Sequence, residues 1–378
     1  MKITNVEAYV LSDKLEKAFY FSQWEYRERL ICIVKVTTDE GLIGWGEGYG
    51  PATVLRAGVE FLKPFLIGRD PLLTETIWQV MYRRTLDYAR RGILMASVSA
   101  IDIALWDLKG KILGQPIHVL LGGKKRDKIR PYATGMYFSR DVEDLAPALA
   151  EEALYYKESG FTYMKMKVGL GIEEDLRNVA AVREAIGTDV HLMVDSNHAY
   201  GYVEALRLAR AMEPYHIHWF EEPLSPEDYA GYARLRAQSP ILIAAGECEY
   251  LRFGFQQLFA QACVDIAQPD ICAAGGISEV KKIMDMAYTF GVDVVTHSWG
   301  TGIALNAALQ LLSNMDIGPG RMHEREALVE LDFTENRLRE ELIFPTIQVK
   351  DGYLYPSDQP GLGIEVNEDI IQQYHLPL

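Results

Sequence analysis

Hydrophobic and polar residues alternate along the first part of the chain as they do in β-strands. This alternation predicts three strands, at residues 6–11, 30–37 and 42–47. Asp39-Glu40-Gly41 would form the hairpin turn between the last two strands. Apolar residues three and four positions apart then predict helices, at residues 51–65, 70–87 and 94–113. Residues 1–125 are therefore expected to form an α+β capping domain.

The pattern changes near residue 129, where short apolar segments begin to alternate with helical ones. The strand candidates are residues 130–134, 163–167, 191–195, 218–222, 242–247, 264–270 and 292–297. The helices expected between them include residues 173–186, 202–212, 226–238, 252–260 and 277–290. Unbroken alternation of this kind predicts a parallel sheet closed into a barrel, with an eighth strand at 321–324.

The predicted fold class is therefore α/β, as a modified TIM barrel of the (β/α)7β type with an N-terminal cap. The barrel would span residues 126–335. Residues 336–378 would form a C-terminal segment, whose Pro- and Gly-rich end at 352–378 packs back onto the capping domain.

Six of the predicted strands end on a residue that could take part in catalysis. In chain order, and at intervals of 28, 26, 26, 23 and 27 residues, they are Lys167, Asp195, Glu221, Glu247, Asp270 and His297. Each interval is the length of one strand plus one helix. These side chains should therefore stand side by side at the carboxyl ends of the strands, where barrel enzymes place their active sites.

Asp195, Glu221 and Glu247 come from three consecutive strands, so their carboxylates should converge. Three carboxylates at close quarters repel one another and raise their own pKa values unless a cation lies between them. Ligands that are all oxygen favour Mg²⁺, with Mn²⁺ as the alternative. One carboxylate alone could equally cap a helix or form an ion pair, but three in this register predict a metal site.

Two further pairs complete the predicted site. Lys165 and Lys167 are two positions apart on a strand, so both should point into the barrel, where each ammonium group would lower the pKa of the other. Asp270 and His297 end neighbouring strands, and a carboxylate that orients an imidazole raises its basicity. Cys248 and Cys272 also lie near the rim and are expected to be buried packing residues.

This set of residues predicts removal of a proton from the carbon next to a carboxylate. A divalent cation and nearby ammonium groups would stabilise the resulting enolate, with Lys167 and His297 available on its two faces. Racemisation, epimerisation and β-elimination all fit, and the residues alone do not choose among them. A Schiff-base aldolase that uses Lys167 would leave the carboxylates without a role. A non-catalytic sugar-acid binding protein would not need Lys165, Lys167 and His297 together.

Composition excludes other classes of function. The formal net charge is −15, and no stripe of Lys and Arg is long enough for nucleic acid. No apolar run is long enough to span a membrane, and the N-terminus lacks the apolar region of a signal peptide. The four cysteines form no C-x-x-C pair. These features predict a cytoplasmic protein that acts on a small molecule.

The motifs around these residues resemble the enolase superfamily, and within it the mandelate racemase subgroup. Lys165-Met166-Lys167 is similar to the K-x-K motif of that subgroup, and residues 99–107 are similar to a helix of its capping domain. The resemblance implies that Asp195, Glu221 and Glu247 bind Mg²⁺, and that Asp270 and His297 form a catalytic dyad. It extends over essentially the whole chain.

Closer details resemble the acid-sugar members of the subgroup, above all galactarolactone cycloisomerases and sugar-acid dehydratases. The motifs concerned are 195–198, 297–302 and 361–365. This resemblance implies β-elimination from a sugar acid or its lactone to a 2-keto-3-deoxy acid, with a racemase or epimerase on the same scaffold as the alternative. It also implies a homo-oligomer. The substrate contacts that it implies are Asn197, His198, Glu326 (or Glu324 in a competing alignment) and, in the loop 16–28, Tyr20, Trp24 and Arg27.

Overall fold

The N-terminal part of the protein is an antiparallel sheet covered by helices. The structure is a computed structural model and describes residues 1–22, 24–316 and 325–377. The sheet contains β1 (Ile3–Phe21), β2 (Trp24–Thr38) and β3 (Ile43–Gly48) in that order. The helices that follow are α1 (Ala52–Leu62), α2 (Thr74–Thr85) and α3 (Ile93–Leu113).

Helix α3 packs closely against β3 because two glycines on the strand leave room for it. A Cβ atom on Gly44 would lie 2.1 Å from the carbonyl oxygen of Ala104, and one on Gly46 would lie 2.0 Å from that of Ala100. Neither distance is possible for real atoms, so only glycine allows this approach.

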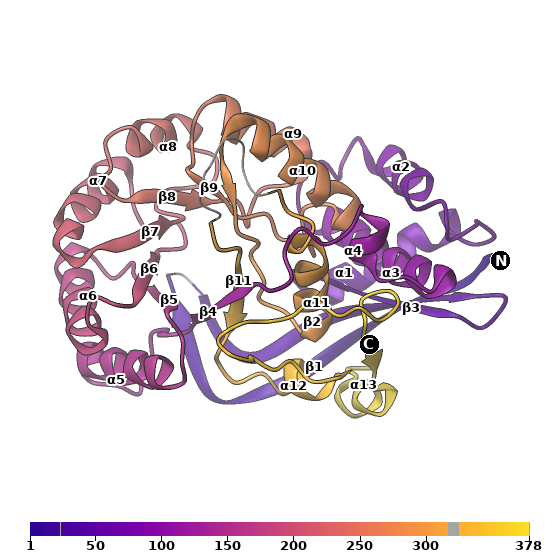
Figure 1. Ribbon diagram of the computed structural model, residues 1–378, viewed down its shortest axis with the longest axis horizontal. Coiled ribbons are helices and arrows are strands. Elements are labelled where there is room, and N and C mark those ends of the chain that lie inside the picture. Colours follow the sequence, from indigo (N-terminus) through magenta and orange to yellow (C-terminus); the bar gives the residue numbers. More distant parts are fainter. Residues whose placement is uncertain (23, 317–324, 378) are drawn as a thin grey trace.

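The β1–β2 hairpin is longer than the sequence predicted. The expected strands at 6–11 and 30–37 extend to Phe21 and back from Trp24, and the hairpin reaches from the N-terminal sheet to the barrel (Figure 1). A register shift between Lys14 and Phe19 interrupts the regular pairing. The alternation of apolar and polar residues is lost there, so the pattern gave no signal for the distal half of the hairpin.

The next part of the chain forms a parallel barrel with helices outside it (Figure 1). Its strands are β4 (Arg130–Thr134), β5 (Tyr163–Lys167), β6 (His191–Asp195), β7 (Ile217–Glu221), β8 (Leu242–Ala245), β9 (Ile266–Ala267), β10 (Asp293–Val294) and β11 (Leu328–Asp332). Its helices are α5 (Leu145–Glu158), α6 (Ile172–Ile186), α7 (Tyr202–Ala211), α8 (Tyr229–Arg236), α9 (Leu251–Ala260), α10 (Gly276–Phe290) and α11 (Gly302–Leu312). A short helix, α4 (Ile117–Leu120), precedes the barrel.

The strand order is β10-β9-β8-β7-β6-β5-β4-β11, and a parallel bridge between Thr296 and Val329 closes the ring. Strands and helices alternate as seven pairs followed by an eighth strand, so the predicted (β/α)7β barrel with an N-terminal cap is confirmed. The eighth strand was expected at 321–324, which lies outside the described residues; β11 pairs with β4 in that role. Strands β9 and β10 are also shorter than predicted.

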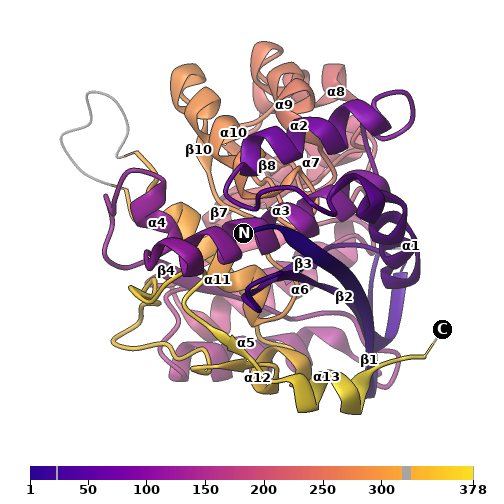
Figure 2. The same cartoon turned by 90° about the vertical axis from the view of Figure 1, so that its right-hand side faces the viewer.

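The C-terminal segment returns to the N-terminal sheet. It contains α12 (Arg337–Glu341), β12 (Ile343–Phe344), β13 (Glu365–Val366) and α13 (Glu368–Tyr374). The backbone N–H of Leu376 donates to the carbonyl of Val10 at 2.8 Å, and the ring centroids of His375 and Tyr9 lie 5.7 Å apart. Figure 2 shows α13 beside β1.

Two buried carboxylates join the N-terminal sheet to the barrel. Glu47, at the end of β3, accepts hydrogen bonds from the backbone N–H (2.9 Å) and hydroxyl (2.6 Å) of Thr301, the N-cap of α11. Burial raises the pKa of Glu47 to about 7, although these hydrogen bonds act to lower it. On the hairpin, Arg29 forms a buried ion pair with Asp332 of β11 at 2.8 Å. These contacts hold the loop after His297 and the hairpin against the same mouth of the barrel.

No helix within residues 1–22, 24–316 and 325–377 combines the length and the apolar character that a bilayer crossing requires.

Candidate active site

The structure brings the six regularly spaced residues to one mouth of the barrel. Lys167, Asp195 and Glu221 are the last residues of β5, β6 and β7, and they lie side by side in the parallel register. Glu247 lies two residues beyond β8. Asp270 and His297 follow β9 and β10 and are paired with each other by a parallel bridge. The regular interval in the sequence is therefore a ring of side chains in space.

Asp195, Glu221 and Glu247 form a compact group of carboxylates. One oxygen from each lies within 4.8 Å of the others, and their exposed fractions are 0%, 0% and 9%. Three buried carboxylates with no nitrogen or sulfur ligand among them match the oxygen ligands that hard divalent cations prefer. These residues could therefore hold such a cation.

Glu221 is held in place by groups outside this carboxylate group. Its Oε2 accepts hydrogen bonds from Trp219 Nε1 at 2.9 Å and from Gln268 Nε2 at 2.6 Å, while Oε1 meets Lys165. Burial raises the pKa of Glu221 to about 7, although Lys165 acts to lower it. Fixed partners of this kind orient a ligand before a metal binds.

Lys165 and Lys167 both point into the barrel, as expected for alternate residues of one strand. Lys165 Nζ lies 2.5 Å from Glu221 Oε1 and 2.9 Å from Glu330 Oε1. Burial alone would lower the pKa of Lys165, but the carboxylates of Glu221, Glu330 and Asp195 outweigh it and hold that pKa well above its usual value. The expectation that the two lysines lower each other's pKa therefore does not describe Lys165, because carboxylates rather than ammonium groups surround it.

Lys167 contacts both charged and aromatic groups. Its Nζ donates to Asp195 Oδ2 at 2.5 Å and to Asn197 Oδ1 at 2.8 Å. The ring centroids of Phe21 and Tyr137 lie 4.6 Å and 5.2 Å from the same Nζ. The ammonium group is thus held where two acceptors and two aromatic faces meet.

His297 and Asp270 form the expected pair. Nδ1 of His297 lies 2.6 Å from Asp270 Oδ2, and the backbone N–H of Cys272 donates to the other Asp270 oxygen. The Nε2 atom faces the centre of the site, 3.4 Å from Glu247 Oε2 and 3.9 Å from Glu330 Oε2. Burial acts to lower the pKa of His297, but Glu247, Glu330 and Asp270 raise it to about 10.

Glu330 is a member of the site that the sequence reasoning missed. It lies on β11, is 1% exposed, and accepts hydrogen bonds from the Thr134 hydroxyl at 2.6 Å and the Ser298 backbone N–H at 3.1 Å. Burial would raise its pKa, but Lys165 and His297 hold it at about 2. The signal was present in the sequence, because a glutamate lies between two apolar residues at 328–332.

Glu326, which the resemblance placed at the substrate, lies at the other end of the barrel. It pairs at 2.6 Å with Arg130, the first residue of β4, and accepts a hydrogen bond from the Tyr353 hydroxyl at 2.7 Å. The strands are parallel, so their first residues all lie at the mouth opposite the charged residues described above. We call those residues the cluster: Lys165, Lys167, Asp195, Glu221, Glu247, Asp270, His297 and Glu330. Glu330, four residues later, occupies the place that was expected for Glu326.

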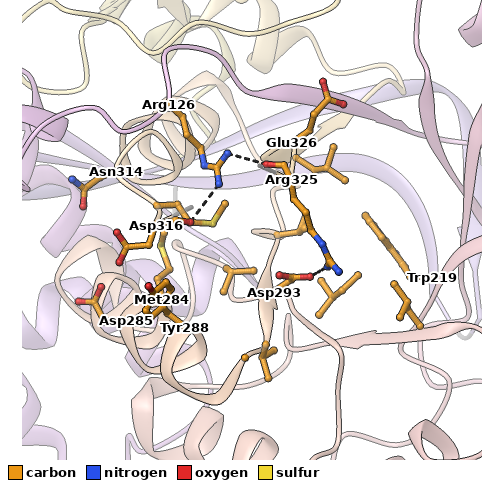
Figure 3. A pocket seen from close by; sticks show the side chains of 18 of the residues that line it. Arg126, Trp219, Met284, Asp285, Tyr288, Asp293, Asn314, Asp316, Arg325 and Glu326 are labelled. Atoms are coloured by element: carbon orange, nitrogen blue, oxygen red, sulfur yellow. Dashed lines mark hydrogen bonds and ion pairs between the residues drawn. The ribbon is translucent and has the colours of Figure 1, made fainter. Parts of the chain in front are cut away.

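A cavity of about 460 Å³ lies at this opposite mouth (Figure 3). Its lining includes the first residues of five strands: Tyr163, Leu242, Ile266, Asp293 and Leu328. Figure 3 shows Arg325 directed at Asp293 and Glu326 at the edge. Size alone would favour this cavity as a binding site, but none of the converging carboxylates, lysines or His297 reaches it. We therefore place the chemistry at the carboxyl ends of the strands.

The distal hairpin covers the cluster with a face other than the one expected. Phe19 and Phe21 of β1 stack on Tyr26 of β2, with ring centroids 5.8 Å and 5.5 Å apart, and Tyr26 meets Trp299 edge to face at 4.8 Å. Alternate residues of a strand point to opposite faces. The inward face is therefore aromatic and apolar.

The three hairpin residues that the resemblance singled out lie elsewhere. Tyr20 is directed away from the cluster and pairs with Phe138, with ring centroids 5.6 Å apart. Trp24 is 63% exposed. Arg27 has an exposed side chain that forms an ion pair with Glu25, at 3.1 Å. The hairpin that carries these residues lies over the site, but the pairing register decides which of its side chains face inward.

Phe21→Ala is expected to lower kcat/KM by about 10-fold, because it removes an aromatic face from Lys167 and opens the cover of the site. The matched variant is Arg27→Ala on the same hairpin, which should stay within about 2-fold of wild type because its side chain is exposed. Steady-state kinetics on both variants makes the comparison. Equal losses in the two variants would contradict the inward face assigned here.

Asn197 and His198 follow β6 in backbone conformations with φ of 41° and 67°. Asn197 is at the cluster through its bond to Lys167. The His198 ring instead faces Glu222 and Cys248. Cys272 is buried, as expected, whereas Cys248 is exposed and so is not the buried packing residue that was predicted.

Comparisons with known proteins give matches that extend over the whole chain. The family model described as "Enolase C-terminal domain-like" matches residues 148–370, and the model for the N-terminal domain of mandelate racemase and muconate lactonizing enzyme matches residues 5–122. D-galactarolactone cycloisomerase of Agrobacterium fabrum is 42% identical over 377 residues, which is 100% of each chain. Arabinonate dehydratase of Saccharolobus solfataricus is 37% identical over 91% of this chain and 90% of its own. The crystal structure of the 3,6-anhydro-D-galactonate cycloisomerase from Zobellia galactanivorans has a TM-score of 0.91 and 52% identity, with both chains covered completely.

Proposed function

The chain belongs to the enolase superfamily, with the type of N-terminal domain found in mandelate racemase and muconate lactonizing enzyme, and on this premise we propose that it opens a cyclic sugar acid by β-elimination. The enzyme would remove the proton from the carbon next to the carboxylate and break the bond between the neighbouring carbon and the ring oxygen. The product is a 2-keto-3-deoxy acid. The reaction is an isomerisation, because the ring oxygen stays in the molecule as a hydroxyl or carboxyl group.

The observation that carries this proposal is the position of Lys167 and His297 about the buried carboxylates. Lys167 ends β5 and His297 follows β10, and in the closed ring these strands are separated by β4 and β11 on one side and by β6 to β9 on the other. A substrate held over Asp195, Glu221 and Glu247 would therefore have a potential proton carrier on each of two sides. In a β-elimination one of these groups can take the α proton and the other can protonate the departing oxygen.

The steps balance as a general acid and base reaction. As the base removes the α proton, the C–H electrons form a carbon–carbon double bond in an enediolate. Those electrons then form the double bond to the β carbon, and the bond to the ring oxygen breaks and leaves its electron pair on the oxygen. The resulting enol becomes the ketone when the former β carbon gains a proton and the enol hydroxyl loses one. Lys165, which bridges Glu221 and Glu330, supplies a fixed positive charge near the enediolate.

We propose that Asp195, Glu221 and Glu247 hold Mg²⁺. Their convergence and the all-oxygen donor set support this choice, and magnesium is typical of the superfamily. When bound, the cation would neutralise negative charge that develops on the substrate carboxylate. Asp270 would fix the ring of His297 through Nδ1, so that Nε2 is the atom that exchanges a proton with the substrate.

The choice of a ring oxygen as the leaving group rests on the relatives. The names of the cycloisomerases at 42% and 52% identity describe substrates whose β oxygen is part of a ring, one a lactone and the other an anhydro sugar. The inward aromatic face of Phe19, Phe21 and Tyr26 also suits a compact ring better than a fully hydrated open chain. The second candidate is a dehydratase of an open-chain sugar acid, which the arabinonate dehydratase relative favours.

Proton NMR in D₂O with Mg²⁺ tests the proposal. The substrates are 3,6-anhydro-D-galactonate, D-galactarolactone and arabinonate, each incubated with the enzyme. We expect a 2-keto-3-deoxy product that carries solvent deuterium from one of the two cyclic acids. Turnover of arabinonate alone would replace this proposal with the dehydratase. Deuterium entering an unchanged acid or its epimer, with no keto product, would replace it with a racemase.

A further inference from the structure

A second group of possible metal ligands lies beside the carboxylates and has no part in the proposed reaction. It consists of His198, Glu222 and Cys248, which offer one nitrogen, one oxygen and one sulfur atom within 4.8 Å of one another. The same three strand ends supply both groups, since Glu222 directly follows Glu221 and Cys248 directly follows Glu247. We propose that this second group binds a thiophilic divalent cation, Zn²⁺.

The distances fit a tetrahedral zinc ion. Zinc lies about 2.05 Å from a histidine nitrogen, about 2.1 Å from a carboxylate oxygen and about 2.3 Å from a thiolate sulfur. At tetrahedral angles these lengths place nitrogen about 3.6 Å from sulfur and about 3.4 Å from oxygen. His198 Nε2 lies 3.5 Å from Cys248 Sγ and 3.1 Å from Glu222 Oε2. The third pair, Cys248 Sγ and a Glu222 oxygen, lies within 4.8 Å.

The His198 ring is oriented as a metal ligand is. Its Nδ1 lies 3.0 Å from the carbonyl oxygen of Leu224, and a carbonyl can only accept, so Nδ1 carries the proton. The other ring nitrogen, Nε2, faces Glu222 and Cys248. A backbone carbonyl that fixes the second ring nitrogen is the usual support of a histidine ligand.

Glu222 gives a second and independent indication of a ligand. Its side chain is 2% exposed, and its Oε2 receives no hydrogen bond from any group in the described parts of the chain. The atom lies close to His198 Nε2, but the contact does not meet the geometry of a hydrogen bond. A buried oxygen without a hydrogen-bond partner is unfavourable, and a cation bound between this oxygen and His198 Nε2 would remove that cost.

The chemistry of the donors selects the cation. Nitrogen and sulfur ligands suit zinc, whereas Mg²⁺ prefers oxygen. On binding, the Cys248 thiol would release its proton to solvent as the bond between zinc and sulfur forms. Cys248 is exposed and gives the ion a route of entry. The open fourth position would hold water.

Cobalt spectroscopy tests this site, because Co²⁺ substitutes for zinc and a thiolate ligand gives a charge-transfer band that carboxylates cannot give. The protein is titrated with Co²⁺ in excess Mg²⁺, and Zn²⁺ is then added. We expect a sulfur-to-cobalt band with about one Co²⁺ per chain, lost when Zn²⁺ displaces the cobalt. The band should be absent in Cys248→Ser and at least about 10-fold weaker in affinity in His198→Asn.

The matched control is Cys263→Ser, which removes another thiol far from this group and should keep the band. Thermal unfolding of each variant verifies that it is folded. A wild-type protein without the band, or a band that survives in Cys248→Ser, overturns the proposal. Neither result bears on the proposed elimination, which needs neither His198 nor Cys248 as a proton carrier, so the two proposals fail separately.

Discussion

His297→Asn is expected to lower kcat by about 10²- to 10⁴-fold, the range in which a positioned acid or base contributes to a reaction. Asparagine can still donate to Asp270, which lies 2.6 Å from Nδ1, so the local geometry should survive. It cannot take or return a proton at the position of Nε2. The loss should therefore appear in kcat rather than KM, measured by steady-state kinetics on the substrate that NMR identifies.

The control for this variant is His191→Asn, the same change at the other end of the barrel. His191 is the first residue of β6 and stacks on Tyr163 at 4.3 Å between ring centroids. Turnover by the His191→Asn variant should remain within about 3-fold of wild type. If His297→Asn also stays within that range, His297 is not a proton carrier. If the His297→Asn variant still exchanges the α proton of the substrate with D₂O but no longer eliminates the β oxygen, His297 is the acid and Lys167 the base.

Asp195→Asn is expected to weaken Mg²⁺ binding by more than about 100-fold and to abolish detectable turnover. Changes in groups that only support a metal ligand already cost about 10- to 100-fold in affinity, and Asp195 is proposed as a ligand itself. The substitution also removes the negative partner of Lys167, whose Nζ lies 2.5 Å from Oδ2. Isothermal titration calorimetry with Mg²⁺ measures the first effect and kinetics the second.

Glu326→Gln is the matched change for Asp195→Asn, because it removes a carboxylate charge at the opposite mouth of the barrel. Glu326 pairs with Arg130 on a partly exposed surface, so neither the affinity for Mg²⁺ nor turnover should change by more than about 2-fold. An unchanged Mg²⁺ affinity in Asp195→Asn would show that the carboxylates do not form the metal site. Loss of affinity in both variants would indicate a general effect of charge.

The sequence predicted the barrel and most of the cluster because both follow from a single regularity. One strand and one helix take up 23 to 28 residues between consecutive members of the ring, and a closed parallel barrel turns that interval into adjacency. Glu247 and Asp270 illustrate the strength of the signal. Both lie beyond the ends of their strands, yet the interval alone assigned them to the correct mouth.

The remaining features depend on pairing and register, which a sequence pattern does not fix. A shift of four residues separates Glu326 from Glu330 and moves a carboxylate from one end of β11 to the barrel interior. In the hairpin, the face of each side chain depends on partners in the other strand. The expected homo-oligomer and the domain boundaries at 125 and 335 stay predictions, since they too depend on contacts rather than on local pattern.

The register shift between Lys14 and Phe19 has a consequence for how this enzyme could diverge. A strand that already carries an irregularity can accept a further inserted or deleted residue there without disturbing the regular pairing nearer the core. One such event would turn Tyr20 inward in place of Phe19 and Phe21, and would leave every residue of the barrel unchanged. Substrate preference can therefore evolve in a single step at the hairpin, while the catalytic apparatus is inherited intact.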